Sequence, residues 1–314
     1  MERNHAIDAF RGCAIIGMIF FTLLLRLSSD LPDLLRHNVW GTVHIGDFVL
    51  PMFLFVSGIS LAYYLEKRKD ISRQVFLKEV TKRFGTLALI GLSLSFFSAS
   101  GFLHMDEVML NALLFLLCVI LARFDWKILL GLICAINVSY LGLVYFNLDD
   151  IFIGYYLGGY PAALYYLPIM ITGLILGKQV MTQGLWNKRN TITMGIIAIL
   201  FLVFLFITPL NKMTATPSFI LLSILVSYLL YVIIEWITRE VTTFGQIENL
   251  GKKPLRYWIM TYVFILIPLW FYVEYTAQEL PLNIFWPFAI LISGGFLILL
   301  WFLTYVSEYI HVSN

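Results

Sequence analysis

The stretch DAFRGCAIIGMIFFTLLL, residues 8–25, sets the kind of fold that most of the chain repeats. After Asp8 and Arg11 it continues to Leu25 without a charged residue, about the length that an α-helix needs to cross the hydrocarbon core of a bilayer. A polar loop follows, and a second apolar run begins near Phe48. In this region ionisable residues border apolar segments on both sides, which makes it the first place to look for function.

Composition shows that the chain is an integral membrane protein. Of its 314 residues, 60% are hydrophobic and 13% are charged, whereas soluble domains are about half apolar and about a quarter charged. The net charge of +2 gives no argument for a nucleic-acid partner. The three cysteines lie within apolar runs without paired spacing, so they predict neither a disulfide framework nor a metal motif.

The apolar runs predict about ten transmembrane helices. No water is present in the hydrocarbon to satisfy open strands, so we expect an all-α polytopic bundle. We find no soluble domain, linker or repeat and expect one transmembrane domain over residues 1–314, with the first helix retained. The predicted spans are 7–27, 48–65, 84–102, 108–122, 128–146, 160–177, 191–208, 217–235, 255–272 and 284–305.

Basic residues predict the orientation of these helices. With the amino terminus in the cytoplasm, eighteen Lys and Arg residues fall on the cytoplasmic side, and only Arg26, Arg36 and Lys212 fall on the other. Positive residues concentrate in cytoplasmic loops. We therefore expect an even number of spans, both termini in the cytoplasm, and a multi-pass protein of the plasma or inner membrane.

Asp8 and Arg11 are three residues apart, so they share one face at the cytoplasmic start of the first span. They form either an ion pair that anchors the helix end or, with Arg11 facing a cavity, a contact for an anionic ligand. The stretch from Gly251 to Trp258 presents the same choice. Its glycine, its cations Lys252 and Arg256, and its aromatics either anchor the helix or bind a phosphate.

His37 lies in the loop after the first span, and Asp47 lies at the mouth of the second. A carboxylate at that depth needs a partner or water, and a carboxylate that orients an imidazole is the usual support for a histidine base. His44 and Asp47, with His104 or Asp106, are a weak alternative as metal ligands. No paired-histidine or paired-cysteine motif supports it, and we expect no metal.

The residues around this loop resemble a known family. Asp8-Ala9-Phe10-Arg11-Gly12, then His37-Asn38-Val39-Trp40-Gly41, then Gly46 to Gly58 (GDFVLPMFLFVSG) are similar to the catalytic region of heparan-α-glucosaminide N-acetyltransferase and its prokaryotic relatives. The similarity is ungapped from Arg36 to Gly58. Weaker similarities occur at Thr216 to Phe219 and at Gly251 to Tyr257. The animal enzyme's additional amino-terminal luminal domain is not part of this sequence.

The resemblance implies an enzyme that takes an acetyl group from cytoplasmic acetyl-CoA and passes it to a sugar on the other side of the membrane. His37 falls on the family's catalytic histidine, and Thr22 stands where that enzyme has a functional asparagine. CoA is a polyanion with an adenine ring, so we expect Arg11, Lys252, Arg256 and Trp258 to bind it. Asn38, Trp40 and Asp8 are the expected substrate contacts, with Asp47 and Thr22 assisting His37.

Two other classes of function remain open from the sequence. A transporter or flippase for a sugar-linked or lipid-linked substrate accounts for ten spans equally well, although its broken helices are expected near the midplane. A non-catalytic lipid-binding or assembly subunit is the third alternative. For an enzyme the expected partners are acyl-CoA, a glycan or glycolipid acceptor and the lipid bilayer, and a homodimer is also open.

Overall fold

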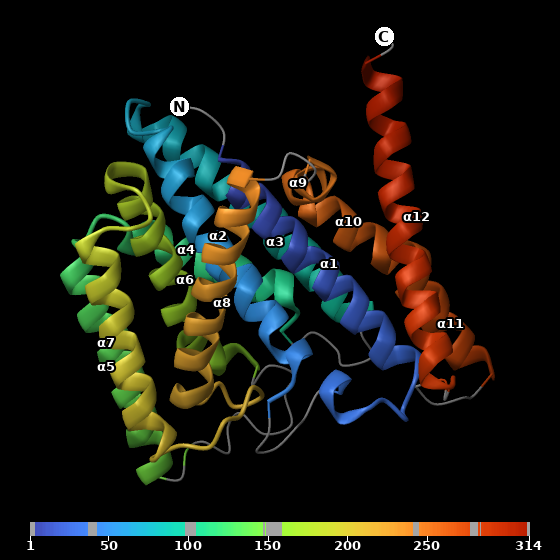
Figure 1. Ribbon diagram of the computed structural model, residues 1–314, viewed down its shortest axis with the longest axis horizontal. Helices are drawn as coiled ribbons and strands as arrows, with labels where there is room; N and C mark the ends of the chain where they lie inside the picture. The colour runs from blue at the N-terminus through green and yellow to red at the C-terminus, as the bar shows by residue number, and fades with distance from the viewer. Residues whose placement is uncertain are drawn as a thin grey trace. The chain divides into compact units, whose positions relative to one another are not determined.

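A computed structural model describes residues 4–36, 43–97, 105–146, 159–240, 245–276 and 284–312, together with Leu148 and Leu282. The regular structure in these residues is helical, without a strand (Figure 1). Each predicted span overlaps a helix, and residues 98–102 of the predicted span 84–102 lie outside the described residues. These helices are α1 His5–Leu27, α2 Val49–Glu66, α3 Arg73–Phe97, α4 Glu107–Leu121, α5 Trp126–Tyr145, α6 Gly159–Gln183, α7 Lys188–Leu205, α8 Pro217–Glu240, α10 Pro254–Thr261 with α11 Ile267–Thr276, and α12 Trp286–Val312.

Three shorter elements and one π-helical turn complete the description. The 3-10 turns η1 (Asp33–Leu35) and η2 (Ile45–Phe48) lie between α1 and α2, and the short helix α9 (Gly245–Lys252) precedes α10. The predicted span 255–272 is a helix whose middle, Tyr262–Leu266 (η6), is π-helical. The sequence pattern predicted neither α9 nor the π-helical turn.

Seven helices in the described part of the chain are long and apolar enough to cross a membrane: α1, α2 with η2, α5, α6, α7, α8 and α12. The apolar helices Glu107–Leu121 and Pro254–Leu269 are shorter, and the first half of α3 carries Lys78, Lys82 and Arg83. The all-α polytopic class is therefore confirmed. The number of ten spans and the cytoplasmic location of both termini stay predictions.

The described residues group into two compact units, each made of separate stretches of the chain. The first unit is built mainly from Leu54–Leu229. The second is built from Glu2–Asn38, His44–Phe53 and Leu230–Asn314. Helices α2 and α8 supply residues to both units.

In the first unit, α6 is the central helix, because it is the most buried of the candidate spans and contacts both α4 and α5. Glycines let α6 and α2 approach closely: a Cβ at Gly173 would lie 2.1 Å from the carbonyl oxygen of Phe55, and one at Gly58 would lie 2.2 Å from that of Met170. Helices in lipid associate through such close packing of small residues. A larger side chain at either position would separate the two helices.

In the second unit, α1 is the central helix and contacts α9, α10 and α12 (Figure 1). A Cβ at Gly12 would lie 2.0 Å from the carbonyl oxygen of Ile247, and one at Gly251 would lie 1.8 Å from that of Asp8, so α1 and α9 touch backbone to backbone. At the other end of α1, the amides of Leu282 and Ile284 donate to the carbonyl oxygens of Arg26 and Leu27. Both ends of α1 are thus held by the carboxyl-terminal part of the chain.

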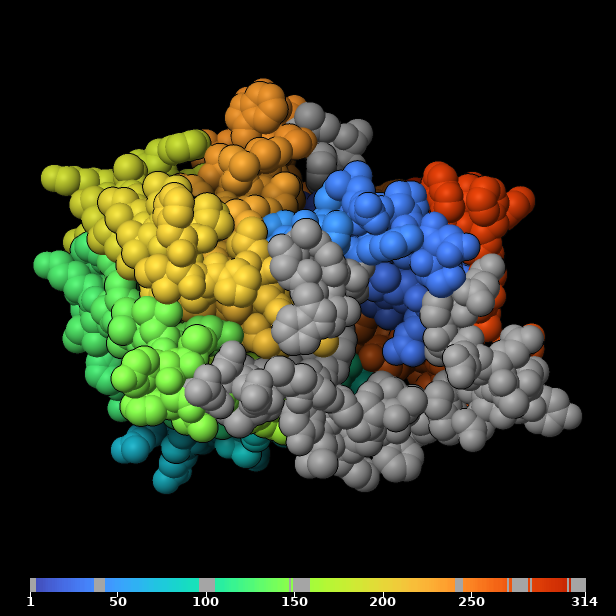
Figure 2. All heavy atoms as spheres, turned by 90° about the horizontal axis from the view of Figure 1, so that it is seen from below, coloured from blue at the N-terminus to red at the C-terminus, as the bar shows by residue number. Residues whose placement is uncertain are grey.

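Large apolar side chains are exposed along the helices, as expected where lipid replaces water. The carboxyl-terminal ends of α5 and α7 carry Tyr145 and Phe206, which are 80% and 90% exposed. These ends belong to the green and yellow surface in Figure 2. In a soluble protein, exposure on this scale would mark an interaction site, but along membrane-crossing helices it marks the lipid-facing surface.

Candidate functional site

The described residues of the candidate site lie in the second unit, and α1 organises them. Asn4 caps the helix by accepting the amide of Ile7, which starts α1 just ahead of Asp8. Arg11 and Thr22 are eleven residues apart, about three turns, so they share one face of α1 about 16 Å apart along its axis. A single rigid helix therefore spaces the two ends of the site.

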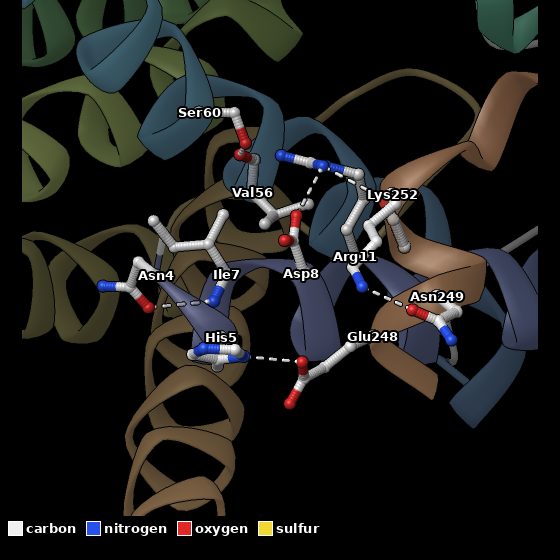
Figure 3. Close-up of polar contacts among 11 residues, drawn as sticks. Asn4, His5, Ile7, Asp8, Arg11, Val56, Ser60, Glu248, Asn249 and Lys252 are labelled. Atoms are coloured by element: carbon white, nitrogen blue, oxygen red, sulfur yellow. Dashed lines mark hydrogen bonds and ion pairs between the residues drawn. The ribbon is translucent and has the colours of Figure 1, made fainter. Parts of the chain in front are cut away.

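At the first end, Arg11 ties α1 to α9 (Figure 3). Its Nη1 donates to Oδ1 of Asp8 at 3.1 Å and to the carbonyl oxygen of Gly251 at 2.8 Å. Asp8 is buried and Arg11 is partly buried. The ion pair, one of the two alternatives that the spacing left open, is present. The contact with the last turn of α9 adds a bond between a cation and the negative end of a helix, which is favourable.

One further polar contact joins α9 to α1, and another lies within α9 (Figure 3). His5 Nδ1 lies 2.7 Å from Oε2 of Glu248, and the ammonium of Lys252 donates to the side chain of Asn249. Sequence analysis had singled out neither His5 nor Glu248. Nothing local to residues 5 or 248 signals a contact between positions 243 residues apart.

The other candidate CoA contacts differ in accessibility. Lys252 and Arg256 are exposed, whereas Trp258 is 2% exposed and packs edge-on against Tyr262 with ring centroids 5.4 Å apart. The indole Nε1–H of Trp258 has no hydrogen-bond partner among the described residues. A buried donor without a partner is costly and unusual in a native protein.

Gly251 takes part in anchoring, one of the two alternatives left open for its stretch. It lies in the last turn of α9, packed against Asp8 and Gly12, and not in an open loop. Pro254 begins α10 and has no N–H to offer an anion. The cations of this stretch therefore do not surround a glycine-rich loop, and Gly251 is not available to hold a phosphate on its backbone.

At the other end, Asp47 lies in η2, which contacts α1. Its carboxylate is 1% exposed, and Oδ2 accepts the amide of His44 at 3.0 Å. The first turn of α2 approaches the middle of α1, where a Cβ at Gly17 would lie 3.1 Å from Val49. Thr22 is partly buried on α1. A buried carboxylate is therefore positioned beside the helix that carries Thr22.

His37, Asn38 and Trp40 lie outside the described residues, so their roles stay predictions. Among the residues that the structure describes, no group of three His, Cys, Asp or Glu side chains could hold a metal ion. Asp106, one of the ligands considered for a metal, instead caps α4 by accepting the amide of Val108 at 3.0 Å. The lack of a metal also stays a prediction.

These features define a class: a polytopic helical membrane protein whose ionisable residues gather at both ends of one helix. Residues 3–190, more than half of the chain, match the family model described as heparan-alpha-glucosaminide N-acetyltransferase, catalytic. The chain belongs to this family, which is one of membrane acetyltransferases. A comparison with curated proteins found no match.

The matched region divides the candidate residues into two groups. Asp8, Arg11, Thr22, His37 and Asp47 fall within it. Lys252, Arg256 and Trp258 lie beyond it, so their assignment depends on the geometry around α1 and on the chemistry of CoA. The two groups are linked through Gly251, which accepts a hydrogen bond from Arg11 and directly precedes Lys252 in the chain.

Proposed function

We propose that this protein transfers an acetyl group from cytoplasmic acetyl-CoA to an amine or hydroxyl group of a sugar or glycolipid on the other side of the membrane. The observation that carries the proposal is the family match over residues 3–190, because it contains His37 and both ends of α1. The reaction needs a donor site on one side, an acceptor site on the other, and a path between them.

The donor side is the end of α1 that contacts α9. Lys252 and Arg256 are exposed cations near this contact, and they are suited to the phosphates of CoA. Arg11 lies deeper and is held by Asp8 and Gly251. In this proposal Arg11 fixes α9, and with it Lys252, in place, and adds positive potential to the site.

In this proposal Trp258 contacts CoA through its indole N–H group and not through the face of its ring. The ring is buried against Tyr262, so adenine cannot stack on it without a shift of α10. The unpartnered Nε1–H can instead donate to one of the two amide carbonyls of the pantetheine arm. Binding of this arm would satisfy a donor that is otherwise left without an acceptor.

On the acceptor side, His37 is the proposed base and Asp47 its orienting carboxylate. The acceptor nitrogen or oxygen forms a bond to the thioester carbonyl carbon while His37 removes its proton. As the tetrahedral intermediate collapses, the carbon–sulfur bond breaks and the CoA thiolate takes up the proton. Thr22 or Asn38 donates a hydrogen bond to the oxyanion. A transient acetyl-histidine is the alternative order of the same bond changes.

The test is acetyl transfer by the purified protein in lipid nanodiscs, with radiolabelled acetyl-CoA and a set of glucosamine-type acceptors. We expect His37→Ala to lower turnover at least 100-fold, the lower end of what general-base catalysis contributes. His311→Ala, in the last turns of α12, is the matched control and should keep full turnover. Asp47→Asn should fall between the two.

Folding of the variants is checked separately by binding of acetyl-CoA. The donor site is at the opposite end of α1, so His37→Ala should bind acetyl-CoA as the unaltered protein does. Full acetyl transfer by a His37→Ala variant that binds acetyl-CoA normally would contradict the assignment of His37.

A further inference from the structure

A second cationic cluster lies in the first unit, at the turn between α2 and α3. Tyr64 near the end of α2 is approached by two guanidinium groups: Cζ of Arg68 lies 3.9 Å from its ring centroid and Cζ of Arg83 lies 5.0 Å from it. Arg83 also lies 4.9 Å from the ring centroid of Phe115 on α4. Tyr64 and Phe115 in turn meet edge to face with centroids 6.2 Å apart. Distances under about 6 Å are those of cation–π contacts.

Two acidic residues of this turn form ion pairs, and both pair with cations other than Arg83. Glu79 pairs with Arg68, and Glu66 pairs with Lys69 at 2.7 Å. Within the described part of the chain, no carboxylate lies within ion-pair distance of Arg83, although the side chain is exposed. Aromatic rings therefore hold the guanidinium of Arg83 in place, while its N–H donors are not used by a carboxylate.

The geometry brings the two arginines within reach of one ligand. Because their Cζ atoms lie 3.9 and 5.0 Å from the same centroid, they are at most 8.9 Å apart, the sum of these distances. A phosphate group accepts charge-assisted hydrogen bonds of about 2.7–2.9 Å on several oxygens, and guanidinium groups match its geometry with paired donors. Two cations within this distance of each other act on the same phosphate group, at the least through their charge.

We propose that Arg68 and Arg83, held on Tyr64 and Phe115, form a binding site for a phosphate group. The site uses none of the residues proposed to contact CoA, and the resemblance to the family did not indicate it. The predicted topology places the α2–α3 turn in the cytoplasm, at the level of lipid headgroups. The phosphate belongs to an anionic phospholipid of that leaflet or to a soluble phosphate ligand, and these two sources can be separated by experiment.

The experiment compares two ligands on the full-length protein in detergent. Native mass spectrometry counts phosphatidylglycerol molecules bound from mixed micelles, with phosphatidylcholine as the reference lipid. Isothermal titration calorimetry measures adenosine 3′,5′-bisphosphate as the soluble ligand. The variants are Arg83→Gln and Arg68→Gln, and the controls of equal charge change are Lys82→Gln and Lys69→Gln. Lys69 belongs to the same turn but is exposed and bound to Glu66.

We expect each arginine variant to weaken binding of one ligand at least fivefold and each lysine variant to weaken it less than twofold. Weaker phosphatidylglycerol binding alone identifies a lipid headgroup as the source, and weaker bisphosphate binding alone identifies a soluble ligand. Arg83→Lys keeps the charge but loses the planar paired donors, so it should restore less than half of the loss. If Arg83→Gln and Lys82→Gln have equal effects in both measurements, the site does not exist and the turn attracts anions only through its net charge.

Discussion

Arg11 and Arg83 are both arginines near the start of an apolar helix segment, but their surroundings differ. In the second unit, Arg11 is partly buried, donates to a buried carboxylate and to a backbone carbonyl, and joins two helices whose backbones touch. In the first unit, Arg83 is exposed and lies against two aromatic rings, without a carboxylate partner among the described residues. Charge and position in the sequence alone do not separate these two cases.

The difference indicates what each arginine does. A guanidinium whose donors are used within the protein stabilises the arrangement of helices. A guanidinium that rings hold in place keeps its donors for a ligand. We therefore expect substitutions at the α1–α9 contact to affect stability first, and substitutions at the α2–α3 turn to affect binding.

The largest effect is expected at Gly251. A valine there would place its Cβ 1.8 Å from the carbonyl oxygen of Asp8, so α9 must move away from α1. We expect Gly251→Val to cost about 3 kcal/mol or more of stability, as severe overpacking does. Thermal unfolding in detergent measures it. Gly245→Ala, whose Cβ would meet nothing within 4 Å, is the control, and equal melting temperatures for the two variants would refute the close α1–α9 contact.

A smaller loss of stability is expected for Arg11→Ala. It removes the hydrogen bonds to Asp8 and Gly251 and leaves the charge of a buried carboxylate less well compensated. We expect a loss of about 2 kcal/mol, with Arg11→Lys losing less because the charge stays. The same unfolding measurement tests this, and an Arg11→Ala protein as stable as the unaltered one would show that Arg11 is not structural.

Arg83→Gln should change stability by only about 0.5–1 kcal/mol, the size of an exposed cation–π contact. This is the direct contrast with Arg11→Ala and is measured in the same unfolding experiment. If Arg83→Gln lowers stability as much as Arg11→Ala does, Arg83 supports the packing of α2, α3 and α4, and the distinction drawn between the two arginines is wrong.

The smallest effect is expected from Glu79→Gln. This change removes the carboxylate that pairs with Arg68 and so frees a second guanidinium for a phosphate. An exposed ion pair contributes about 0.5 kcal/mol, so phosphate binding should strengthen about twofold. The affinity of this variant for phosphatidylglycerol or bisphosphate tests the expectation. Weaker binding than in the unaltered protein would mean that Glu79 holds Arg68 in the position that binds phosphate.

Hydropathy and charge predicted the fold class and the location of the helices, because every helix that crosses a bilayer needs about 20 mostly apolar residues. Ten predicted segments correspond to helices, including α1, α6 and α12. The pattern could not predict α9, which is short and polar, nor the π-helical turn at Tyr262–Leu266, because one extra residue in a helical turn leaves hydropathy unchanged.

The site was predictable only where its contacts are local. The pair of Asp8 and Arg11 follows from a spacing of three residues, and it is present. The bond from Arg11 to Gly251 and the pair of His5 and Glu248 join positions more than 200 residues apart, and no local pattern announces them. The roles of His37, Asn38 and Trp40 came from the family resemblance and stay predictions.

The most direct test of the central claim is transfer across a sealed membrane. The protein is reconstituted into proteoliposomes that enclose glucosamine, radiolabelled acetyl-CoA is added only outside, and the acetylated sugar inside is measured after removal of external label. We predict labelled sugar inside vesicles with the unaltered protein or His311→Ala, and none above background with His37→Ala. Acetylation only when donor and acceptor share the same side, or undiminished transfer by His37→Ala, would contradict the account.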